Sequence, residues 1–256
     1  MKNTQKHIIA NLLKANAAIS FFLLLLMAFL AACSTPTISS DNDSVEDDSA
    51  EDVLAEDDSA EDDSFSSSDV LKESMFNSQI DYGSMTDSRD GQVYRTVEIG
   101  KQTWMAENLN FKTVDSYCYE DNASNCTRYG RLYLWDAAAS ACPNGWHLPT
   151  NSEWETLFEA VGGRSVAGTA LKSQTGWESN GNGTDDYGFS AFPAGYRNAY
   201  GGSRYGGRTA DIWTATEKDS ERDRVYFVHM SYSINSALLS IHNKKKLGCS
   251  VRCLKD

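Results

Sequence analysis

The sequence predicts a mixed α+β domain of short antiparallel strands, with one or two helices and long irregular loops. Three observations lead to this class. Residues 141–163 contain the start, the apolar face and the end of one helix. Short apolar segments separated by turn residues lie on both sides of that helix, a pattern that favours antiparallel pairing over βαβ units. Two glycine-rich loops divide the second group of strands from the helix.

The helix is predicted to begin at Thr150. Glu153 follows three residues later, so the two can form a capping box that satisfies free amides at a helix start. One apolar face is then formed by residues with i, i+3, i+4, i+7 spacing: Trp154, Leu157, Phe158 and Val161. The pair Gly162-Gly163 ends the helix. We expect Trp146, which lies in the extended approach to the cap, to be in the core together with Trp154.

Strands are predicted before and after this helix. Val93–Ile99 alternates apolar and polar residues, and Gly100-Lys101 is a turn into a second strand at 103–105. The end of the chain is rich in strand signals, with apolar segments at 212–216, 225–228, 237–241 and 247–254.

The first 32 residues are typical of a secretory signal, because three lysines precede a short apolar run that ends in small residues. Leu30-Ala31-Ala32-Cys33 resembles the lipobox of bacterial lipoproteins, which implies cleavage after Ala32 and lipidation of Cys33. Ser34 resembles the second residue of lipoproteins that are sent to the outer membrane. We therefore expect a surface-exposed protein that is anchored by lipid and does not span the membrane. The other interpretation is an ordinary signal peptide with an incidental cysteine.

Residues 33–85 are predicted to be a disordered linker. The part between Asp41 and Glu73 contains a repeated five-residue acidic and serine-rich unit, with fifteen acidic residues and one lysine. Such a segment cannot bury a core, and its like charges repel one another. The alternative is an acidic tail that binds calcium or a basic partner.

The remaining residues, 86–256, are predicted to form a single domain. They contain twenty acidic and nineteen basic residues, so the net charge of −13 belongs almost wholly to the linker. No basic stripe offsets the anionic linker, which argues against a nucleic-acid partner. A chain of this length is sufficient for a sizeable core.

Five cysteines follow Cys33, and an exported protein favours disulfides. We expect Cys118 to pair with Cys126, which closes a short loop, and Cys142 to pair with Cys253, which fastens the helix region to the last strand. Cys249 cannot pair with Cys253 if both lie on one extended strand, because residues four apart are about 13 Å from each other. Cys249 is then expected to be a buried free thiol.

Several motifs of the domain resemble, in matching order from Asp90 to Asp256, the Fibrobacter succinogenes major paralogous domain. They are 100–110 (GKQTWMAENLN), 129–133 (YGRLY), 142–150 (CPNGWHLPT), 188–197 (GFSAFPAGYR), 213–217 (WTATE) and 250–253 (SVRC). That family occurs on exported bacterial proteins and has no settled biochemical activity. More distantly, Trp146–Thr150 with Glu153-Trp154 is similar to the formylglycine-generating enzymes. This similarity implies a C-type lectin-like fold.

No enzyme is expected. A formylglycine-type oxidase needs a reactive cysteine pair near the end of the domain, and Cys253 resembles the structural cysteine of the closing strand. His147, His229 and His242 are interpreted as packing or surface residues, because no nucleophile motif accompanies them. The ligand spacing of a zinc site is absent as well.

Two loops are candidate binding sites. The first supplies oxygen ligands that suit calcium, from Asn180, Asn182, Asp185 and Asp186, although these are also ordinary turn residues. The second gathers tyrosine and arginine among glycines, which is typical of a recognition loop: Tyr196, Arg197, Tyr200, Arg204, Tyr205 and Arg208.

Three interpretations of function follow from the sequence. The first is a non-catalytic surface module that binds a polysaccharide or a cell-surface protein. The second is a structural or assembly component of the envelope without a small ligand, and the third is a divergent enzyme. Glycan as a ligand class depends on fold analogy at this point.

Overall fold

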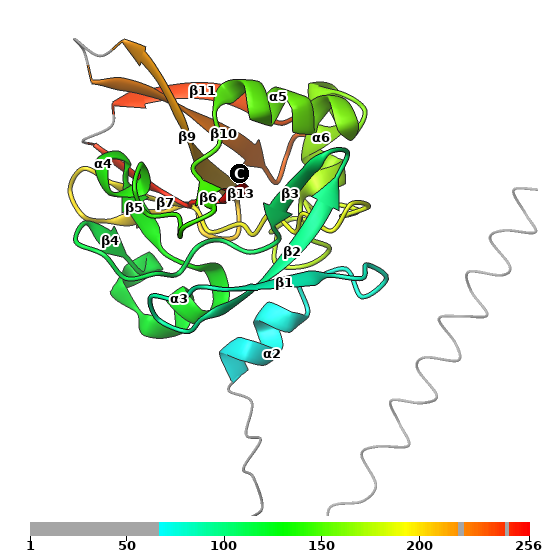
Figure 1. Ribbon diagram of the computed structural model, residues 1–256, viewed down its shortest axis with the longest axis horizontal. Coiled ribbons are helices and arrows are strands. Elements are labelled where there is room, and N and C mark those ends of the chain that lie inside the picture. Colours follow the sequence, from blue (N-terminus) through cyan, green and yellow to red (C-terminus); the bar gives the residue numbers. More distant parts are fainter. Residues whose placement is uncertain (1–66, 220–222, 244–245) are drawn as a thin grey trace, which may run out of the picture. The chain divides into compact units, whose positions relative to one another are not determined.

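Antiparallel strands make up most of the secondary structure, as the sequence predicts (Figure 1). The computed structural model describes residues 67–219, 223–243 and 246–256. The expected signal peptide, Cys33 and the five-residue repeats lie outside these residues, whereas residues 67–85 of the predicted linker lie within them. The described strands form three sheets.

The first sheet has the strand order β1-β2-β3-β13-β6. Its strands are β1 (Gly83–Thr86), β2 (Val93–Ile99), β3 (Gln102–Met105), β13 (Leu254–Lys255) and β6 (Trp146–His147). β2 and β3 form the predicted hairpin, with Val97 opposite Trp104. Leu254 pairs with both Trp104 and His147, so the end of the chain is inserted between the first hairpin and the entry to the predicted helix.

Two further sheets contain the rest of the strands. One has the order β11-β10-β9 and consists of β9 (Thr209–Asp219), β10 (Arg224–Ser231) and β11 (Leu238–Asn243). The other has the order β4-β5-β12-β7-β8 and consists of β4 (Ser116–Tyr117), β5 (Leu132–Leu134), β12 (Leu247–Cys249), β7 (Tyr196–Asn198) and β8 (Ser203–Arg204).

The described residues contain more helices than the one or two that were predicted. They are α2 (Ser67–Glu73), the 3-10 helix η1 (Tyr119–Asp121), α3 (Ala123–Tyr129), α4 (Trp135–Ala138), α5 (Asn151–Ala160) and α6 (Arg164–Leu171). Most are too short to show a periodic apolar face. α6 escaped prediction for another reason: Gly163, which helps to end α5, is also the N-cap of α6.

The predicted helix is α5, and its capping box is confirmed. The Thr150 side chain accepts a hydrogen bond from Glu153 N, and the Glu153 carboxylate accepts one from Thr150 N at 2.7 Å. Trp154 is fully buried, as expected. Trp146 is only half-buried; it packs against the core from β6, which is an edge strand of its sheet.

The core of the domain is built on large aromatic side chains. Trp154 of α5 packs against Trp104 of β3, with ring centroids 4.8 Å apart, and both contact Phe189 edge to face. The inner face of the β9-β10-β11 sheet contributes Val228 and Met230 to the same cluster. The helix therefore joins the first hairpin to the three-stranded sheet.

The ordered domain begins before residue 86, so the predicted boundary between linker 33–85 and domain 86–256 is placed too late. β1 pairs with β2 from Gly83 onward. Two ion pairs dock α2 on the domain, one between Lys72 and Glu107 and one between Glu73 and Arg95. Fully buried Met75 supplies apolar surface that the acidic repeat lacks.

Both expected disulfides are formed, Cys118–Cys126 and Cys142–Cys253. Cys249 is a buried free thiol, but the geometric reason given for it from the sequence is wrong. Residues 247–254 are not one strand: β12 and β13 belong to different sheets, and residues 250–253 cross between them.

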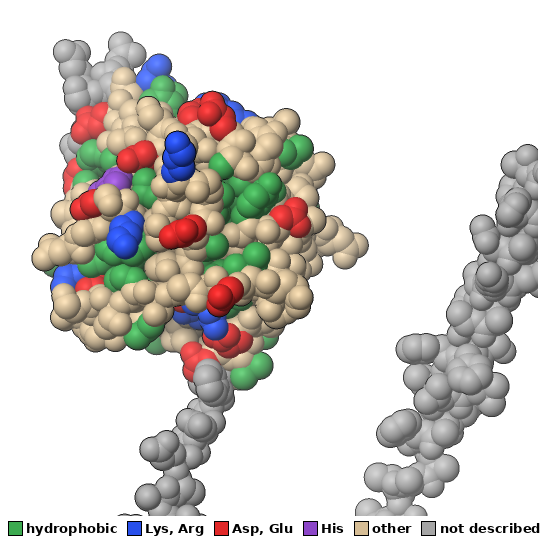
Figure 2. Space-filling view, turned by 45° about the vertical axis from the view of Figure 1, so that its right-hand side comes forward, with side chains coloured by type: hydrophobic (Ala, Val, Ile, Leu, Met, Phe, Trp, Pro, Cys, Tyr) green, Lys and Arg blue, Asp and Glu red, His purple; other side chains and the backbone are tan. Residues whose placement is uncertain are grey.

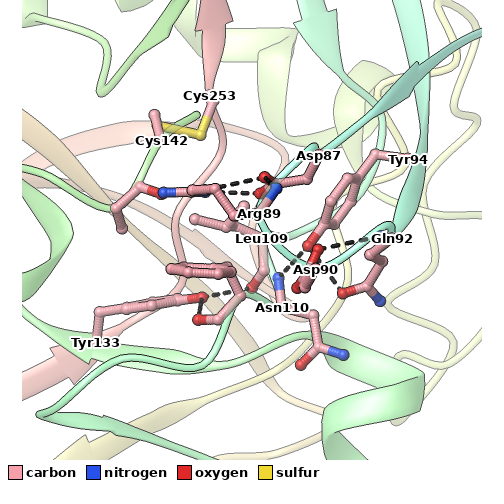
Figure 3. A network of polar contacts seen from close by, with 12 residues as sticks. Asp87, Arg89, Asp90, Gln92, Tyr94, Leu109, Asn110, Tyr133, Cys142 and Cys253 are labelled. Atoms are coloured by element: carbon pink, nitrogen blue, oxygen red, sulfur yellow. Dashed lines mark hydrogen bonds and ion pairs between the residues drawn. A yellow bond between two sulfur atoms is a disulfide. The ribbon is translucent and has the colours of Figure 1, made fainter. Parts of the chain in front are cut away.

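A network of polar contacts surrounds the long-range disulfide (Figure 3). The Arg89 guanidinium donates to Asp87 Oδ2 at 2.6 Å and to the carbonyl of Ala141, the residue before Cys142, at 2.8 Å. Nearby, the Tyr94 hydroxyl accepts from Asn110 N at 3.0 Å, and the Tyr133 hydroxyl donates to the Phe111 carbonyl at 2.7 Å. These hydrogen bonds attach the loop that contains Arg89 and the irregular segment at residues 110–111 to the rest of the domain.

The surface carries no single dominant charge on the face shown in Figure 2, where acidic and basic side chains are interspersed. This distribution agrees with the near-zero net charge counted for residues 86–256. Within the described ranges, no helix has the length and apolar character needed to cross a bilayer.

Candidate functional site

The outer face of the β9-β10-β11 sheet is covered at one end and open at the other. Side chains alternate along a strand, so His229, between the core residues Val228 and Met230, points to the other face, as does Phe227. Phe227, paired with Trp213, packs into a second core cluster that also contains Tyr94, Tyr133 and Cys253. Beyond Phe227 the face carries the polar residues Thr209 and Asp211 of β9 and His229 and Ser231 of β10. His242 of β11 shares this face on the other side of Phe227, where it pairs with Val225.

A cavity of about 360 Å³ lies over this polar end. The sheet lines it with the residues just named together with Phe227, and the facing segments line it with Tyr196, Tyr205, Arg208, Tyr232 and Leu247. Its volume is in the range of small-molecule sites, which hold an organic ligand with a few convergent polar groups. The cavity therefore lies between the three-stranded sheet and the strands β7 and β12 of the neighbouring sheet.

Asp211 and His229 form the polar centre of the cavity. They are direct cross-strand partners, and His229 Nδ1 lies 2.6 Å from Asp211 Oδ1. Thr209 Oγ1 donates to the other carboxylate oxygen at 2.7 Å. The hydrogen bond to Asp211 raises the pKa of His229, whereas burial acts in the opposite direction. The pair thus holds the imidazole in one orientation with its Nε2 left for a ligand.

Tyr196 and Tyr205 form an aromatic wall on the opposite side. Their ring centroids are 5.7 Å apart and the planes are tilted by 44°. Gly195 makes this approach possible, because a Cβ at that position would lie 2.2 Å from the Arg204 carbonyl oxygen. Tyr205 remains 51% exposed, so a large part of its surface is accessible to a ligand.

The recognition loop predicted from the sequence contributes only half of its residues to the cavity. Tyr196, Tyr205 and Arg208 line it. Arg197 instead pairs with Asp121 at 2.8 Å and stacks on a neighbouring tyrosine ring. Tyr200 is 97% exposed and Arg204 is exposed, and neither lines the cavity.

The sequence interpretation missed Asp211 and treated His229 as a packing or surface residue. Alternation along each strand could have shown that Asp211 and His229 point away from the apolar face of their own strands. That the two residues lie opposite each other follows from the register of β9 against β10, which could not be deduced without knowing which strands pair. His242, also set aside, shares that face and lines the cavity, whereas His147 contacts Glu153 and Asp256 near the surface of the first sheet.

The predicted calcium loop uses most of its oxygens within the protein. Asn182 Oδ1 accepts from Trp177 N at 3.0 Å, and Asp186 Oδ2 accepts from a neighbouring threonine. Asp185 is fully buried, and its carboxylate accepts from both the amide and the hydroxyl of Ser190 at 2.7 Å. Asn180 lies in a left-handed turn. The described residues hold no group of three or more His, Cys, Asp or Glu side chains suited to a metal ion.

Asp185 makes stability depend on pH. Burial raises its pKa from 3.8 to about 7, although the bonds from Ser190 act to lower it. Because the folded state then binds the proton more tightly than the unfolded chain, this group favours folding at low pH, and its contribution is lost as pH rises through about 7. We expect Asp185→Asn to reduce the fall in the free energy of unfolding between about pH 4 and 8. Urea denaturation across this range measures the effect.

Asp186→Asn is the matched control for this prediction, since the Asp186 carboxylate is exposed and adjacent in sequence. The control should keep most of the pH dependence of the wild type, because the Asp186 charge is only the smallest of the causes that shift the pKa of Asp185. An unchanged pH profile in Asp185→Asn would contradict the assignment of that dependence to the buried carboxyl group.

Comparison with known families places the cavity within a recognised domain. A sequence model described as the Fibrobacter succinogenes major domain matches residues 97–255. The chain belongs to this family. The match confirms the resemblance seen in the sequence motifs and contains every residue that lines the cavity. Neither the curated proteins nor the solved structures contain a match to the chain.

The Fibrobacter succinogenes major domain is a family of unknown function, so the site must be interpreted from its own chemistry. In this member, the family match begins within β2, whereas α2 and β1 precede it and pack on the domain. The motifs that carried the resemblance supply mainly scaffold: Trp104, Trp213 and Arg252 are each buried. Several residues that line the cavity, notably Tyr205 and His229, lie outside those motifs.

Proposed function

We propose that the domain is a non-catalytic module that binds carbohydrate in the cavity between Tyr196–Tyr205 and Asp211–His229. One observation carries the proposal: an aromatic wall faces an oriented polar pair across a cavity of about 360 Å³. The face of a sugar ring packs on a tyrosine, and its hydroxyl groups bond to imidazole, tyrosine and serine side chains.

A saccharide suits this geometry better than a protein surface. A stable protein interface buries about 800 Å² on each partner and is centred on well-packed anchors. The cavity is small and concave, and its exposed tyrosine lies at the rim. A saccharide is therefore the proposed ligand, and the binding test below also detects a protein ligand.

The absence of catalysis is part of the proposal and is supported by the state of the two last cysteines. Cys253 is held in a disulfide with Cys142, and Cys249 is fully buried. Burial also raises the pKa of the Cys249 thiol well above its usual range, which disfavours the reactive thiolate. A formylglycine-type oxidation would need an accessible, reactive pair.

The proposal also places the module at the bacterial cell surface. The lipobox-like sequence before Cys33 supports a lipid anchor in the outer membrane, and the acidic repeat would act as a spacer between membrane and domain. A C-type lectin-like architecture belongs to the same proposal and is supported by the Trp146–Thr150 motif at the entry to α5.

Tyr205→Ala is expected to weaken binding of the soluble domain to a retained glycan by at least about tenfold, because a stacked tyrosine is a typical energetic centre of a site. Tyr200→Ala is the matched control: it removes a tyrosine from the same loop that lies outside the cavity. A glycan array identifies the ligand, and titration calorimetry measures the affinity of each variant.

Equal loss in both variants would show that the loop binds without the cavity and would contradict the proposal. If the domain retains a cell-surface protein but no glycan, and Tyr205→Ala weakens that retention, the ligand of the cavity is a protein. If neither glycan nor envelope extract is retained, the binding function fails and an envelope structural role is favoured.

A further inference from the structure

The cavity offers positive charge to a ligand but no accessible carboxylate. Of the residues that line it, Arg208, His229 and His242 are basic and Asp211 alone is acidic. Both oxygens of Asp211 are occupied, one by His229 Nδ1 at 2.6 Å and one by Thr209 Oγ1 at 2.7 Å. The Asp211 side chain is only 3% exposed. A ligand therefore meets N–H donors and hydroxyl groups, while the balancing carboxylate lies beneath the imidazole.

His229 is placed to present a charged donor. Its side chain is 28% exposed, and its Nδ1 is fixed by Asp211, so Nε2 is the nitrogen that can reach a ligand. The bond to Asp211 raises the pKa of His229, so the protonated ring persists to higher pH than in a free histidine. In that state Nε2 donates to an anionic oxygen, which is stronger than a bond between neutral groups.

Arg208 provides a second donor at the rim. Its Nε donates to Glu178 Oε2 at 2.7 Å, which uses one of the five guanidinium N–H groups. Glu178 offsets part of the arginine charge but does not line the cavity. The guanidinium is thus oriented by Glu178 while its remaining donors match the planar geometry of a carboxylate.

We infer that the ligand is a saccharide that carries an acidic group, such as a uronic acid, with that group bound to His229 and Arg208 and the ring against Tyr196 and Tyr205. The inference rests on the proposed carbohydrate-binding function and names the ligand class for the same cavity. A neutral sugar would offer only uncharged acceptors to His229 Nε2 and to the guanidinium N–H groups of Arg208 that Glu178 does not use. An acidic sugar gives these donors a charged acceptor, and such hydrogen bonds are stronger.

The test compares saccharides that differ only at the carboxyl group, which is either a free carboxylate or an uncharged methyl ester. The soluble domain is titrated with uronic-acid oligosaccharides and with their methyl esters, after an array that contains acidic and neutral saccharides has ranked the candidates. We expect the acid form to bind at least about tenfold more tightly than its ester, as a charged bond replaces a neutral one. Arg208→Gln should remove about the same factor for the acid alone, and Arg204→Gln, outside the cavity, should remove none.

The pH dependence gives a second readout. Groups facing or near His229 are Asp211 and Arg208 on the β9 side, His242 on β11, and the tyrosines of the opposite wall. Affinity for the acid should fall as pH rises through the elevated pKa of His229, whereas the ester should change little. His229→Gln keeps a neutral N–H donor and should abolish this pH dependence, whereas His242→Gln should retain it.

Each outcome separates the two proposals. If the ester or a neutral saccharide binds as tightly as the acid, with loss in Tyr205→Ala, the acidic class is overturned and the carbohydrate function stands. Equal weakening by Arg204→Gln and Arg208→Gln would assign the effect to general charge and also overturn the inference. Binding of no acidic saccharide on the array overturns it as well, and the carbohydrate function fails too if no saccharide of any kind is retained.

Discussion

Replacing Arg252 by methionine is expected to lower the free energy of unfolding by at least about 3 kcal/mol, because several buried acceptors lose their donor at about 1–3 kcal/mol each. Arg252 is fully buried on the segment that crosses from β12 to β13. Its guanidinium donates to Asn108 Oδ1 at 2.7 Å, to the Met105 carbonyl at 3.2 Å and to the Ser190 carbonyl at 2.6 Å.

The cost arises because the acceptors cannot find other partners. In the substituted protein they would stay buried, and an unsatisfied buried group costs about 1–3 kcal/mol. Two aromatic rings, Phe189 and Phe192, also lie against the guanidinium, with its carbon 4.7 and 5.3 Å from their centroids. Burial lowers the pKa of Arg252 to about 9, and the group remains charged at neutral pH.

Urea denaturation of Arg252→Met measures this loss, with Arg204→Met as the matched control. Arg204 is exposed, and its guanidinium bonds only to the adjacent Ser203 carbonyl among the described residues. The control should change the free energy of unfolding by less than about 0.5 kcal/mol. A similar small change for Arg252→Met would show that methionine and water replace the network without penalty.

Local signals in the sequence predicted local structure well. Thr150 and Glu153 act within four residues of each other, so the capping box and the start of α5 follow from spacing alone. Two disulfide pairings were predicted correctly from the positions of the cysteines and from the expected export of the chain. The boundary at residue 86 was missed because docking of α2 depends on partners, Glu107 and Arg95, that are distant in sequence.

The site shows the same division between local and non-local information. Tyr196, Tyr205 and Arg208 were found because tyrosine, arginine and glycine gather in one loop. Asp211 and His229 meet only through the register of β9 against β10, and a shift of one residue would place them on opposite faces. Composition can therefore suggest a recognition loop, but the polar centre of the cavity requires the paired sheet.

The double substitution Cys142→Ser with Cys253→Ser is expected to lower the free energy of unfolding by about 2–5 kcal/mol. The cysteines are 111 residues apart in sequence, so the bond restricts a large part of the unfolded chain. In the folded state it joins the entry of α5 to the segment that contains Arg252. Arg89 also donates a hydrogen bond to the carbonyl of Ala141, next to Cys142 (Figure 3). This bond should keep the local backbone in place when the disulfide is removed.

The second disulfide is a built-in control for the entropic part of this effect. Cys118–Cys126 spans a separation of only 8 residues. The chain-entropy model therefore expects Cys118→Ser with Cys126→Ser to cost about 2 kcal/mol less than the long-range pair. Denaturation under non-reducing conditions measures both variants. An equal or larger loss in the short-loop variant would locate the stabilisation in local contacts, such as those of Arg131 with both sulfur atoms, and not in restriction of the unfolded chain.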